Sequence, residues 1–206
     1  MSFDSLPALM KCQDPLVIFK SWFQLAQEKA PRSPETEGTA MVLSTVNAKG
    51  FPSSRVVLLK EIHENKFVFF TNYHSKKAHD LFENPQVSIT FHWSHLVRQV
   101  NIQGIASKTS REISENYWKS RPKESQVSQS LSLQSEPIPQ GIVLETEFEK
   151  TKNRFLGHEI PCPQHWGGIQ ILPHTFEFWI GKPNRLHDRV TFSFDGKTWT
   201  HQQLYP

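Results

Sequence analysis

Cysteine is scarce in this sequence, which has only two cysteines among its 206 residues. Cys12 and Cys162 stand far apart, and neither belongs to a CxxC pair. This spacing excludes a disulfide framework and a cysteine-rich zinc site. Because two reduced thiols are typical of proteins in a reducing compartment, we expect a cytoplasmic protein.

Long hydrophobic runs are also missing. No apolar stretch approaches the roughly 20 residues that a membrane-spanning helix needs. Residues 1–15 contain an early acidic residue, Asp4, and no sustained apolar segment, which does not resemble a signal peptide. The sequence therefore predicts no contact with a membrane.

The sequence lacks the short motifs of several enzyme classes. It contains no GxGxxG after a strand, no GxxxxGK followed by Ser or Thr, and no GxSxG. These absences exclude a dinucleotide-binding fingerprint, a P-loop and a nucleophile elbow. The pairs His92/His95 and Cys162/His165 offer too few ligands for a metal, so we predict no metal site.

Charge of one sign is not concentrated anywhere in the chain. The net charge is +3, and lysines and arginines appear singly or in pairs beside hydroxyls and aromatics. This distribution favours pockets for phosphorylated small molecules over a basic stripe for nucleic acid. The aromatic residues, 12% of the chain, fall mainly in apolar alternation and indicate core positions. We expect no nucleic-acid partner.

Residues 14–30 have apolar side chains at helical spacing and predict an amphipathic helix. Asp14 is a suitable N-cap, and Pro15 fits the first helical position. The polar, proline-rich residues 31–38 predict a loop.

The period then changes to that of strands. Residues 47–50 and 61–66 are turn material, and Asp195-Gly196 marks a hairpin. Predicted strands cover 40–46, 51–60, 67–71, 87–93 and 98–108, with a C-terminal strand region at about 169–206. The sum is a mainly β protein with flanking helices, a single domain over residues 1–206 built on an antiparallel β-barrel.

Three helices interrupt these strands. Residues 75–85 predict a helix with Ser75 as its cap, and Thr109 with Glu112 predicts a capping box for a helix over 111–120. The polar residues 121–141 predict a loop with one short helix, followed by a helix over 142–156 and a loop over 160–168.

Two segments carry cations in patterns that suit phosphate binding. Arg55 and Lys60 stand at the two ends of one predicted strand, on opposite faces unless a bulge intervenes. Lys76 and Lys77 open the helix after Ser75, where backbone N–H groups and the helix dipole favour an anion. Taken alone, each segment is better explained without a ligand, as an apolar strand flanked by charges and as an ordinary capped helix with solvated lysines.

Two further segments combine cations with other polar groups. Tyr117, Arg121 and Ser125 share one helical face if the helix continues through Pro122, and together they would grip a phosphate. Residues 185–189, RLHDR, alternate Arg185, His187 and Arg189 on one strand face. A polar helix end and a surface strand paired through its acidic residue are the alternatives.

Taken in order, these segments resemble the pyridoxamine (pyridoxine) 5′-phosphate oxidase family from about Asp14 to Pro206. The matching phrases are RVVLLK, FFTNYHSKKAHD, VRQV, YWKSRPKESQ, LQSE, WGG, EFW and NRLHDR. The resemblance implies an FMN-binding split barrel and a homodimer with two active sites shared between its subunits. It implies FMN-dependent oxidation of pyridoxamine and pyridoxine 5′-phosphate to pyridoxal 5′-phosphate, with O2 reduced to H2O2.

The same resemblance implies which residues form the site. The implied FMN-binding residues are Arg55, Val56, Val57, Leu58, Leu59, Lys60, Phe70, Thr71, Lys76, Lys77, Gln99, Gln134, Ser135, Trp179 and Arg189. The implied substrate-binding residues are Lys60, Tyr117, Arg121, Ser125, Arg185 and His187, of which Arg185 and His187 are also the candidate catalytic residues.

The chain departs from the family pattern at several places. Phe70 stands where a tyrosine is frequent, and Lys76 replaces an arginine and so loses a bidentate fork. The residues after Gln126 are more polar than usual, and the basic segment before the first helix has no match. Two alternatives stay open: a related FMN oxidase with another substrate, such as a phenazine precursor, and a flavin-binding or pyridoxal-phosphate-binding module without turnover.

Overall fold

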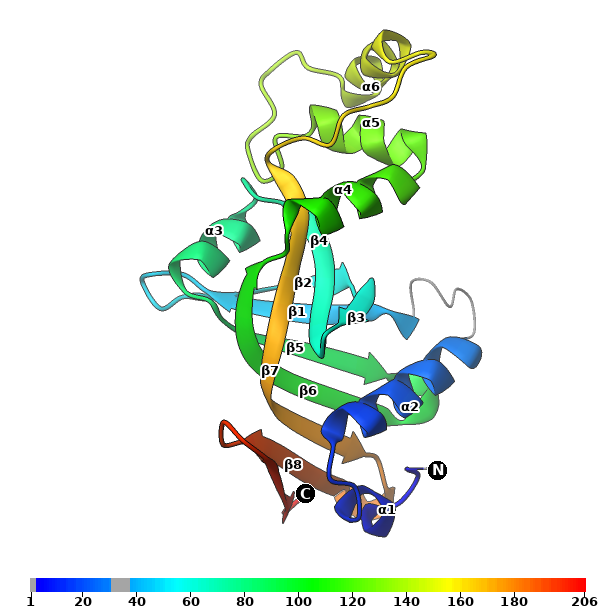
Figure 1. The fold of residues 1–206 in the computed structure, drawn as a ribbon, viewed down its shortest axis with the longest axis vertical. Helices are drawn as coiled ribbons and strands as arrows, with labels where there is room; N and C mark the ends of the chain where they lie inside the picture. Colours follow the sequence, from blue (N-terminus) through cyan, green and yellow to red (C-terminus); the bar gives the residue numbers. More distant parts are fainter. Residues whose placement is uncertain (1–2, 31–37) are drawn as a thin grey trace.

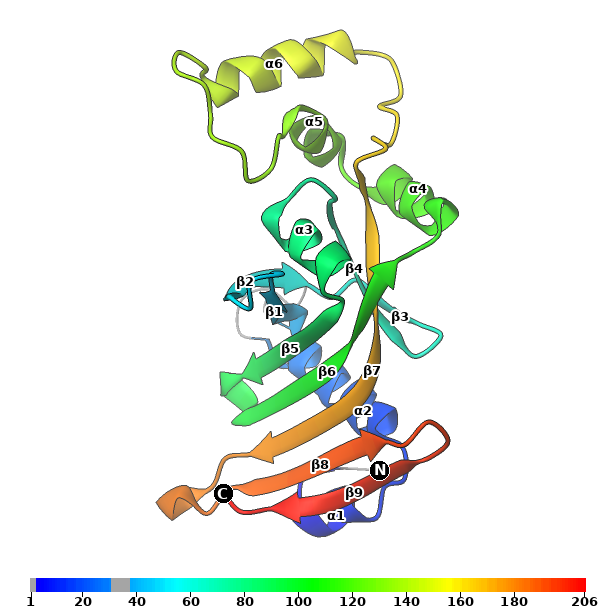
Figure 2. The same cartoon turned by 90° about the vertical axis from the view of Figure 1, so that its left-hand side faces the viewer.

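The computed structural model describes residues 3–30 and 38–206, and these residues form one nine-stranded antiparallel sheet with helices around it (Figure 1). The strand order is β2-β1-β5-β6-β7-β4-β3, and β8 and β9 continue the sheet from β7. The strands are β1 Ala40–Val46, β2 Pro52–Leu58, β3 Glu61–His63, β4 Lys66–Asn72, β5 Gln86–Trp93, β6 Arg98–Lys108, β7 Trp166–Ile180, β8 Asp188–Phe194 and β9 Trp199–Leu204. The sheet curls into a half-barrel, which confirms the predicted antiparallel split barrel (Figure 2).

The long strand β7 connects the two ends of the molecule. It pairs with β6 along its length, with β4 through its first residues and with β8 through its last. A register shift between Gln103 and Gly104 bends β6 against β7. A Cβ atom at Gly104 would lie 2.5 Å from the carbonyl oxygen of Leu172, so this close approach requires glycine.

The main core lies between the sheet and α2 (Pro15–Glu28). Phe19 of α2 is fully buried and packs edge-on against Phe67 and Phe91, with ring centroids 4.9 and 5.0 Å apart. Asp14 caps the helix as predicted, since its side chain accepts a hydrogen bond from the Leu16 N–H at 2.9 Å. Residues 31–37 of the predicted loop lie outside the described residues.

The helices gather at opposite ends of the sheet (Figures 1 and 2). One end carries α3 (Lys76–Glu83), α4 (Arg111–Ser120), α5 (Lys123–Leu131) and α6 (Leu144–Arg154). The other end carries β8, β9 and α1 (Leu6–Met10), a helix that the sequence analysis did not predict. The 3-10 turns η2 (Ser94–Leu96) and η3 (Pro183–Arg185) complete the fold.

Several predicted boundaries are wrong. The side chain that caps α4 is Ser110, which accepts from the Ile113 N–H at 3.2 Å, in place of the predicted Thr109 and Glu112 capping box. The predicted turn over 61–66 contains β3, because Glu64 and Asn65 alone make the turn with positive φ angles. The predicted loop over 160–168 is shorter, because β7 already begins at Trp166 to pair with β4. In the part of the chain that the structure describes, no helix is long and apolar enough to cross a bilayer.

Candidate functional site

Two half-buried cations, Arg55 and Lys77, lie where β2 faces the start of α3. The Lys77 ammonium donates to Thr71 Oγ1 and Ser75 Oγ, both at 3.1 Å. Burial, and then the nearby charge of Arg55, lowers the pKa of Lys77 to about 8. The two hydroxyls that contact Lys77 do not compensate its charge, so this position favours an incoming anion.

The guanidinium of Arg55 is positioned by Thr45 and by the buried carboxylate of Asp80. Its guanidinium donates to Thr45 Oγ1 at 2.7 Å and lies 3.9 Å from Asp80 Oδ2. Burial lowers the pKa of Arg55, while Asp80 acts in the opposite direction. Asp80 also accepts from Lys76 Nζ at 3.3 Å. Sequence reasoning missed Asp80, although it stands four residues after Lys76 on α3 and therefore on the same helical face.

The first turn of α3 contacts a segment that is distant in the sequence. Ser75 occupies the N-cap position but makes no capping bond, because its hydroxyl donates to the Asn72 carbonyl at 2.7 Å. The Lys76 N–H instead donates to Ser135 Oγ at 3.2 Å, and Asn72 Nδ2 donates to the Ser132 carbonyl at 3.1 Å. The segment around Gln134 and Ser135 is thus folded onto the same helix N-terminus as Lys77, as the resemblance implies.

An aromatic stack stands next to these cations. The ring of Phe70 lies 3.9 Å from that of Tyr117 and 5.4 Å from that of Trp166, with interplanar angles of 13° and 15°. The Arg121 guanidinium lies over Trp166, 4.8 Å from the ring centroid. Its Nη1 is buried and has no hydrogen-bond partner among the described residues. Burial lowers the pKa of Arg121 and raises that of Tyr117.

The predicted helical face of Tyr117, Arg121 and Ser125 is wrong. α4 ends at Ser120, because the residue before a proline avoids the helical region, and Arg121 is extended (φ −75°, ψ 146°). Ser125 belongs to the separate helix α5, which begins at Lys123. Tyr117 and Arg121 nevertheless meet at Trp166, so two of the three residues come together by another route.

A second set of predicted residues lies on the last strands of the sheet. Gln99 of β6 pairs with Trp179 of β7, and Trp179 pairs with Arg189 of β8, so the three side chains form one row on the same face. Arg189 Nε donates to Glu177 Oε1 at 2.9 Å, and its Nη1 donates to the Tyr205 carbonyl at 2.9 Å. This arginine is therefore already paired.

The predicted strand face of Arg185, His187 and Arg189 is also wrong. β8 begins only at Asp188, and Arg185 lies in η3 with a φ of 59°. The side chain of Asp188 is buried and pairs with Lys182 Nζ at 2.6 Å, which turns the chain before the strand starts. The His187 ring lies 4.6 Å from that of Trp179, and its Nδ1 accepts from the Lys182 N–H at 3.1 Å. Arg185 is exposed on the turn η3, between β7 and β8.

A single chain holds these two sets far apart. Thr71 pairs with Gly167 near the start of β7, whereas Gln99 pairs with Trp179 near its end. At a rise of roughly 3.3 Å per residue, the twelve residues from 167 to 179 span about 40 Å along the strand. The start of β7, beside α4, and its end, beside β8, lie well apart in both views (Figures 1 and 2). We call the set of Arg55, Thr71, Lys77, Tyr117 and Arg121 the helical half-site. We call the set of Gln99, Trp179, Arg185, His187 and Arg189 the strand half-site.

The predicted cofactor-binding run after Arg55 leaves its strand early. β2 ends at Leu58, and the Lys60 N–H donates to the Val68 carbonyl of β4 at 2.9 Å. The prediction that Arg55 and Lys60 stand at the two ends of one strand is therefore wrong, because the chain has moved from β1 to β4 by Lys60. Burial increases along this run, from exposed Val56 through half-buried Val57 and Leu58 to buried Leu59. Lys60, which follows, is exposed.

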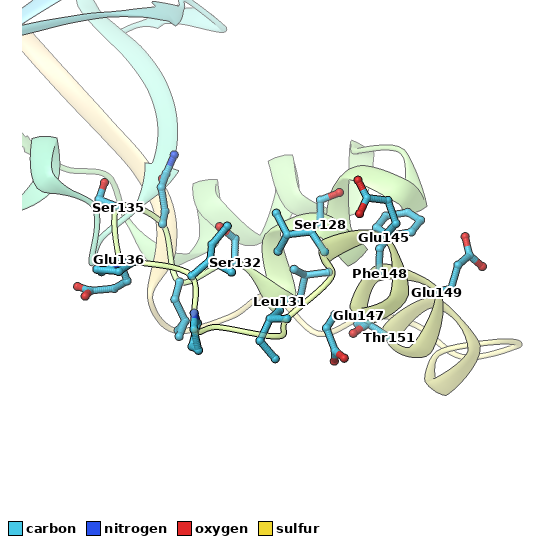
Figure 3. Close-up of a pocket in the computed structure, with 17 residues that line it drawn as sticks. Ser128, Leu131, Ser132, Ser135, Glu136, Glu145, Glu147, Phe148, Glu149 and Thr151 are labelled. Atoms are coloured by element: carbon cyan, nitrogen blue, oxygen red, sulfur yellow. The ribbon is translucent and has the colours of Figure 1, made fainter.

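A cavity of about 870 Å³ lies beside the helical half-site (Figure 3). It is bounded by α5, α6 and the segment between them, and Gln134 and Ser135 line its edge. Its lining contains no lysine or arginine, and its charged residues are the glutamates Glu136, Glu145, Glu147 and Glu149. An acidic cavity repels phosphate, so the anion-binding positions are those of Lys77 and Arg121. Over residues 3–30 and 38–206, no group of three or more His, Cys, Asp or Glu side chains is placed to hold a metal.

Family models and similar sequences point to the same protein family. Residues 31–155 match the family model described as pyridoxamine 5′-phosphate oxidase, and residues 166–206 match the pyridoxine 5′-phosphate oxidase C-terminal dimerisation region. The chain is 47% identical to pyridoxine/pyridoxamine 5′-phosphate oxidase 2 of Hydrogenovibrio crunogenus, over 94% of this chain and 89% of that protein. It is 45% identical to the pyridoxine/pyridoxamine 5′-phosphate oxidase of Rhodopirellula baltica, over 94% and 87%.

Two solved structures are also similar. PhzG from Burkholderia lata, in complex with tetrahydrophenazine-1-carboxylic acid, superposes with a TM-score of 0.90 at 26% identity, over 100% of this chain and 98% of that chain. An FMN-binding protein related to pyridoxamine 5′-phosphate oxidase, from Nostoc punctiforme, superposes with a TM-score of 0.74 at 15% identity, over 96% and 100%. The second likeness concerns the fold alone.

Proposed function

This chain belongs to the pyridoxamine 5′-phosphate oxidase family, and we propose that it oxidises pyridoxamine and pyridoxine 5′-phosphate to pyridoxal 5′-phosphate with FMN as cofactor and O2 as acceptor. The observation that carries the proposal is the pair of under-compensated cation sites in the helical half-site. Lys77 contacts only hydroxyls, and Arg121 keeps a buried nitrogen without a partner among the described residues. Two phosphorylated molecules held side by side require two such sites.

The residues present fit FMN. Its phosphate would be held by Arg55, Lys77 and Thr71, with the N-terminus of α3 adding the favourable end of the helix dipole. Lys76, Gln134 and Ser135 border this position, and Val56 to Lys60 and Phe70 would hold the rest of the flavin. Bound FMN supplies the acceptor for a hydride from C4′ of the substrate and passes the electrons to O2.

The substrate phosphate would bind to Arg121, with Tyr117, Ser125 and Lys60 as further donors. The guanidinium of Arg121 presents two parallel donors that match phosphate oxygens, and burial makes such charge-assisted bonds stronger than in water. The neighbouring rings of Phe70, Tyr117 and Trp166 exclude water from this position. Pyridoxine, which has no phosphate, would leave the charge of Arg121 unpaired.

Arg185 and His187 complete the proposed site from the strand half-site. Because a backbone N–H donates to His187 Nδ1, the neutral imidazole carries its proton on Nε2, which then donates to a substituent of the pyridine ring. Arg185 is exposed on its turn, and we place its guanidinium beside the carbon that is oxidised, where its positive charge would stabilise the negative charge that develops as the amine or hydroxyl proton leaves to water. Gln99, Trp179 and Arg189 would hold the flavin ring from the same side.

A homodimer follows from the separation of the half-sites. Since one chain keeps them at opposite ends of β7, a second copy must bring its strand half-site to the helical half-site of the first. The match of residues 166–206 to a dimerisation region supports this arrangement, because that region carries Trp179, Arg185, His187 and Arg189.

A related oxidase with a ring substrate other than a pyridine phosphate is the second candidate. The similarity to PhzG favours it, since that structure contains tetrahydrophenazine-1-carboxylic acid. The buried Arg121 beside Tyr117 argues for a phosphorylated substrate, because its charge would otherwise stay uncompensated.

The test is a visible absorption spectrum of the protein with FMN, followed by pyridoxine 5′-phosphate without air and then with air. We expect a flavin spectrum that bleaches anaerobically and recovers with O2 while the aldehyde product forms. A bound flavin that does not bleach would support the second candidate, and a protein that does not bind FMN would refute both.

A further inference from the structure

We propose that Arg111 is a positioning residue that holds Trp166, and through it the substrate-phosphate site, in place. This inference rests on the proposed function. Arg111 is the first residue of α4 and contacts neither Lys77 nor Arg121 in any interaction described above. Its guanidinium instead binds the segment that leads into β7, just before the aromatic stack.

The contacts of Arg111 use its whole fork of donors. Nη1 donates to the carbonyls of Pro163 and Trp166 at 3.0 and 3.1 Å, and Nη2 donates to the Cys162 carbonyl at 2.5 Å. Nε donates to Glu115 Oε1 at 2.8 Å, one turn further along α4. Three carbonyls that point at one centre need several donors in a fixed plane, which arginine provides and lysine does not.

Other contacts hold this segment at its two ends and at one carbonyl within it, that of His165, which accepts from the Tyr73 N–H at 2.6 Å. Trp118 Nε1 binds the Ile160 carbonyl at 2.8 Å, upstream of the segment, and Ser114 Oγ accepts from the Gly168 N–H at 3.1 Å, downstream of it. Residues 162–166 lie between these two anchors, and Arg111 fastens them to α4. Because α4 also carries Tyr117, the two rings that flank Phe70 are set by one helix.

A displacement of Trp166 would also displace Arg121, the residue that we assign to the substrate phosphate. Its guanidinium rests on the Trp166 ring at 4.8 Å, so a shift of that ring moves the group that we assign to the phosphate. The cations Arg55 and Lys77 are fixed by β1, β4 and α3 and share no contact with residues 162–166. Loss of Arg111 should therefore impair substrate binding and spare the binding of FMN.

The experiment compares Arg111→Gln and Arg111→Lys with Glu115→Gln, each loaded with FMN. Glu115→Gln is the matched control, because it removes the charge of the ion pair and leaves the three carbonyl contacts. For Arg111→Gln we expect KM for pyridoxine 5′-phosphate to rise about tenfold with kcat within about twofold, as expected for a loss of binding common to ground and transition state. Arg111→Lys should recover part of the loss, and Glu115→Gln should match the wild type.

Two further readouts separate positioning from general damage. The near-ultraviolet circular dichroism of the stacked aromatics should change in Arg111→Gln, while FMN occupancy stays at the wild-type level. A wild-type KM in Arg111→Gln, or a parallel loss of FMN, would overturn the inference. If Arg111→Gln does not fold, the same criteria apply to Arg111→Lys. A wild type that does not oxidise pyridoxine 5′-phosphate would refute the proposed function, and the dichroism and the affinity for inorganic phosphate would then decide the role of Arg111.

Discussion

The two half-sites differ in how far the charges of their key cations are compensated by neighbouring groups. In the helical half-site, Lys77 contacts only hydroxyls and Arg121 keeps a buried nitrogen without a partner among the described residues. In the strand half-site, Arg189 is paired with Glu177 and with the Tyr205 carbonyl. A cation without a full counter-charge, such as Lys77 or Arg121, favours an anion more strongly than a cation that is already paired. We infer that the helical half-site holds the phosphates and that the strand half-site acts on the rings.

The largest effect should come from the exposed turn of the strand half-site. Arg185→Ala should lower kcat with pyridoxine 5′-phosphate by about 100-fold, because charge placed at the reacting atoms acts mainly in the transition state. FMN occupancy should not change, since the phosphate-binding cations lie in the other half-site. The measurement is steady-state peroxide formation beside the flavin absorbance. Unchanged turnover would remove Arg185 from the mechanism, and Arg154→Ala on α6 is the control for loss of an exposed arginine.

The second effect concerns substrate phosphate recognition. Arg121→Gln should raise KM for pyridoxine 5′-phosphate by about 50-fold, because a buried charge-assisted pair is lost. Activity on pyridoxine, which has no phosphate, should change little. The ratio of kcat/KM for the two substrates measures the effect, and Arg121→Lys should retain part of the preference. A preference that survives in Arg121→Gln would place the substrate phosphate elsewhere.

The third effect is a pH dependence of FMN binding. The pKa of Lys77 is lowered to about 8 in the protein without FMN, and a bound phosphate should raise it again. The protonated ammonium binds the phosphate, so FMN affinity should be constant below pH 8 and fall by up to about tenfold per pH unit above it. Fluorescence titrations with FMN between pH 6.5 and 9.5 measure this.

Two variants test the assignment of that pH dependence. Lys77→Gln should bind FMN more weakly and lose the decline above pH 8, whereas Lys77→Arg should keep tight binding without the decline, because arginine stays charged. A decline that persists in Lys77→Gln would assign the titration to another group.

The smallest effect should follow from the paired arginine. Glu177→Gln leaves Arg189 with its bond to the Tyr205 carbonyl, so we expect FMN affinity to change by only about threefold, as for a half-exposed ion pair. Glu147→Gln, which removes an exposed ion pair on α6, is the matched control in the same titration. A loss as large as that of Lys77→Gln would contradict the division of roles between the half-sites.

The local pattern of the sequence predicted most of the elements. β1 and α4 have the predicted bounds, because strand alternation in one and the helical spacing of the other leave little ambiguity, although the cap of α4 is Ser110 and not the predicted Thr109. The turn at Arg185 was not predicted, because Asn184 and Arg185 both adopt positive φ angles that alternation does not encode. That the chain forms a single domain stays a prediction.

The site residues were predicted as a set, but their division was not. Motif order placed Thr71 and Trp179 in one list, whereas the sheet order puts them at opposite ends of β7. Asp80 and Arg111 were missed, because their roles depend on neighbours distant in sequence: Thr45 for the first and the carbonyls of residues 162–166 for the second. Such contacts become visible only when the strands are paired.

The most direct test of the account mixes two inactive variants. Arg121→Gln damages the helical half-site and Arg185→Ala the strand half-site, so a mixed dimer keeps one site in which both halves are intact. After denaturation and refolding of an equimolar mixture, with the substrate far below KM, random pairing should restore about a quarter of wild-type activity. Each variant refolded alone should stay inactive. If the mixture stays as inactive as its components, each site lies within one chain, and the division of the site between two subunits is wrong.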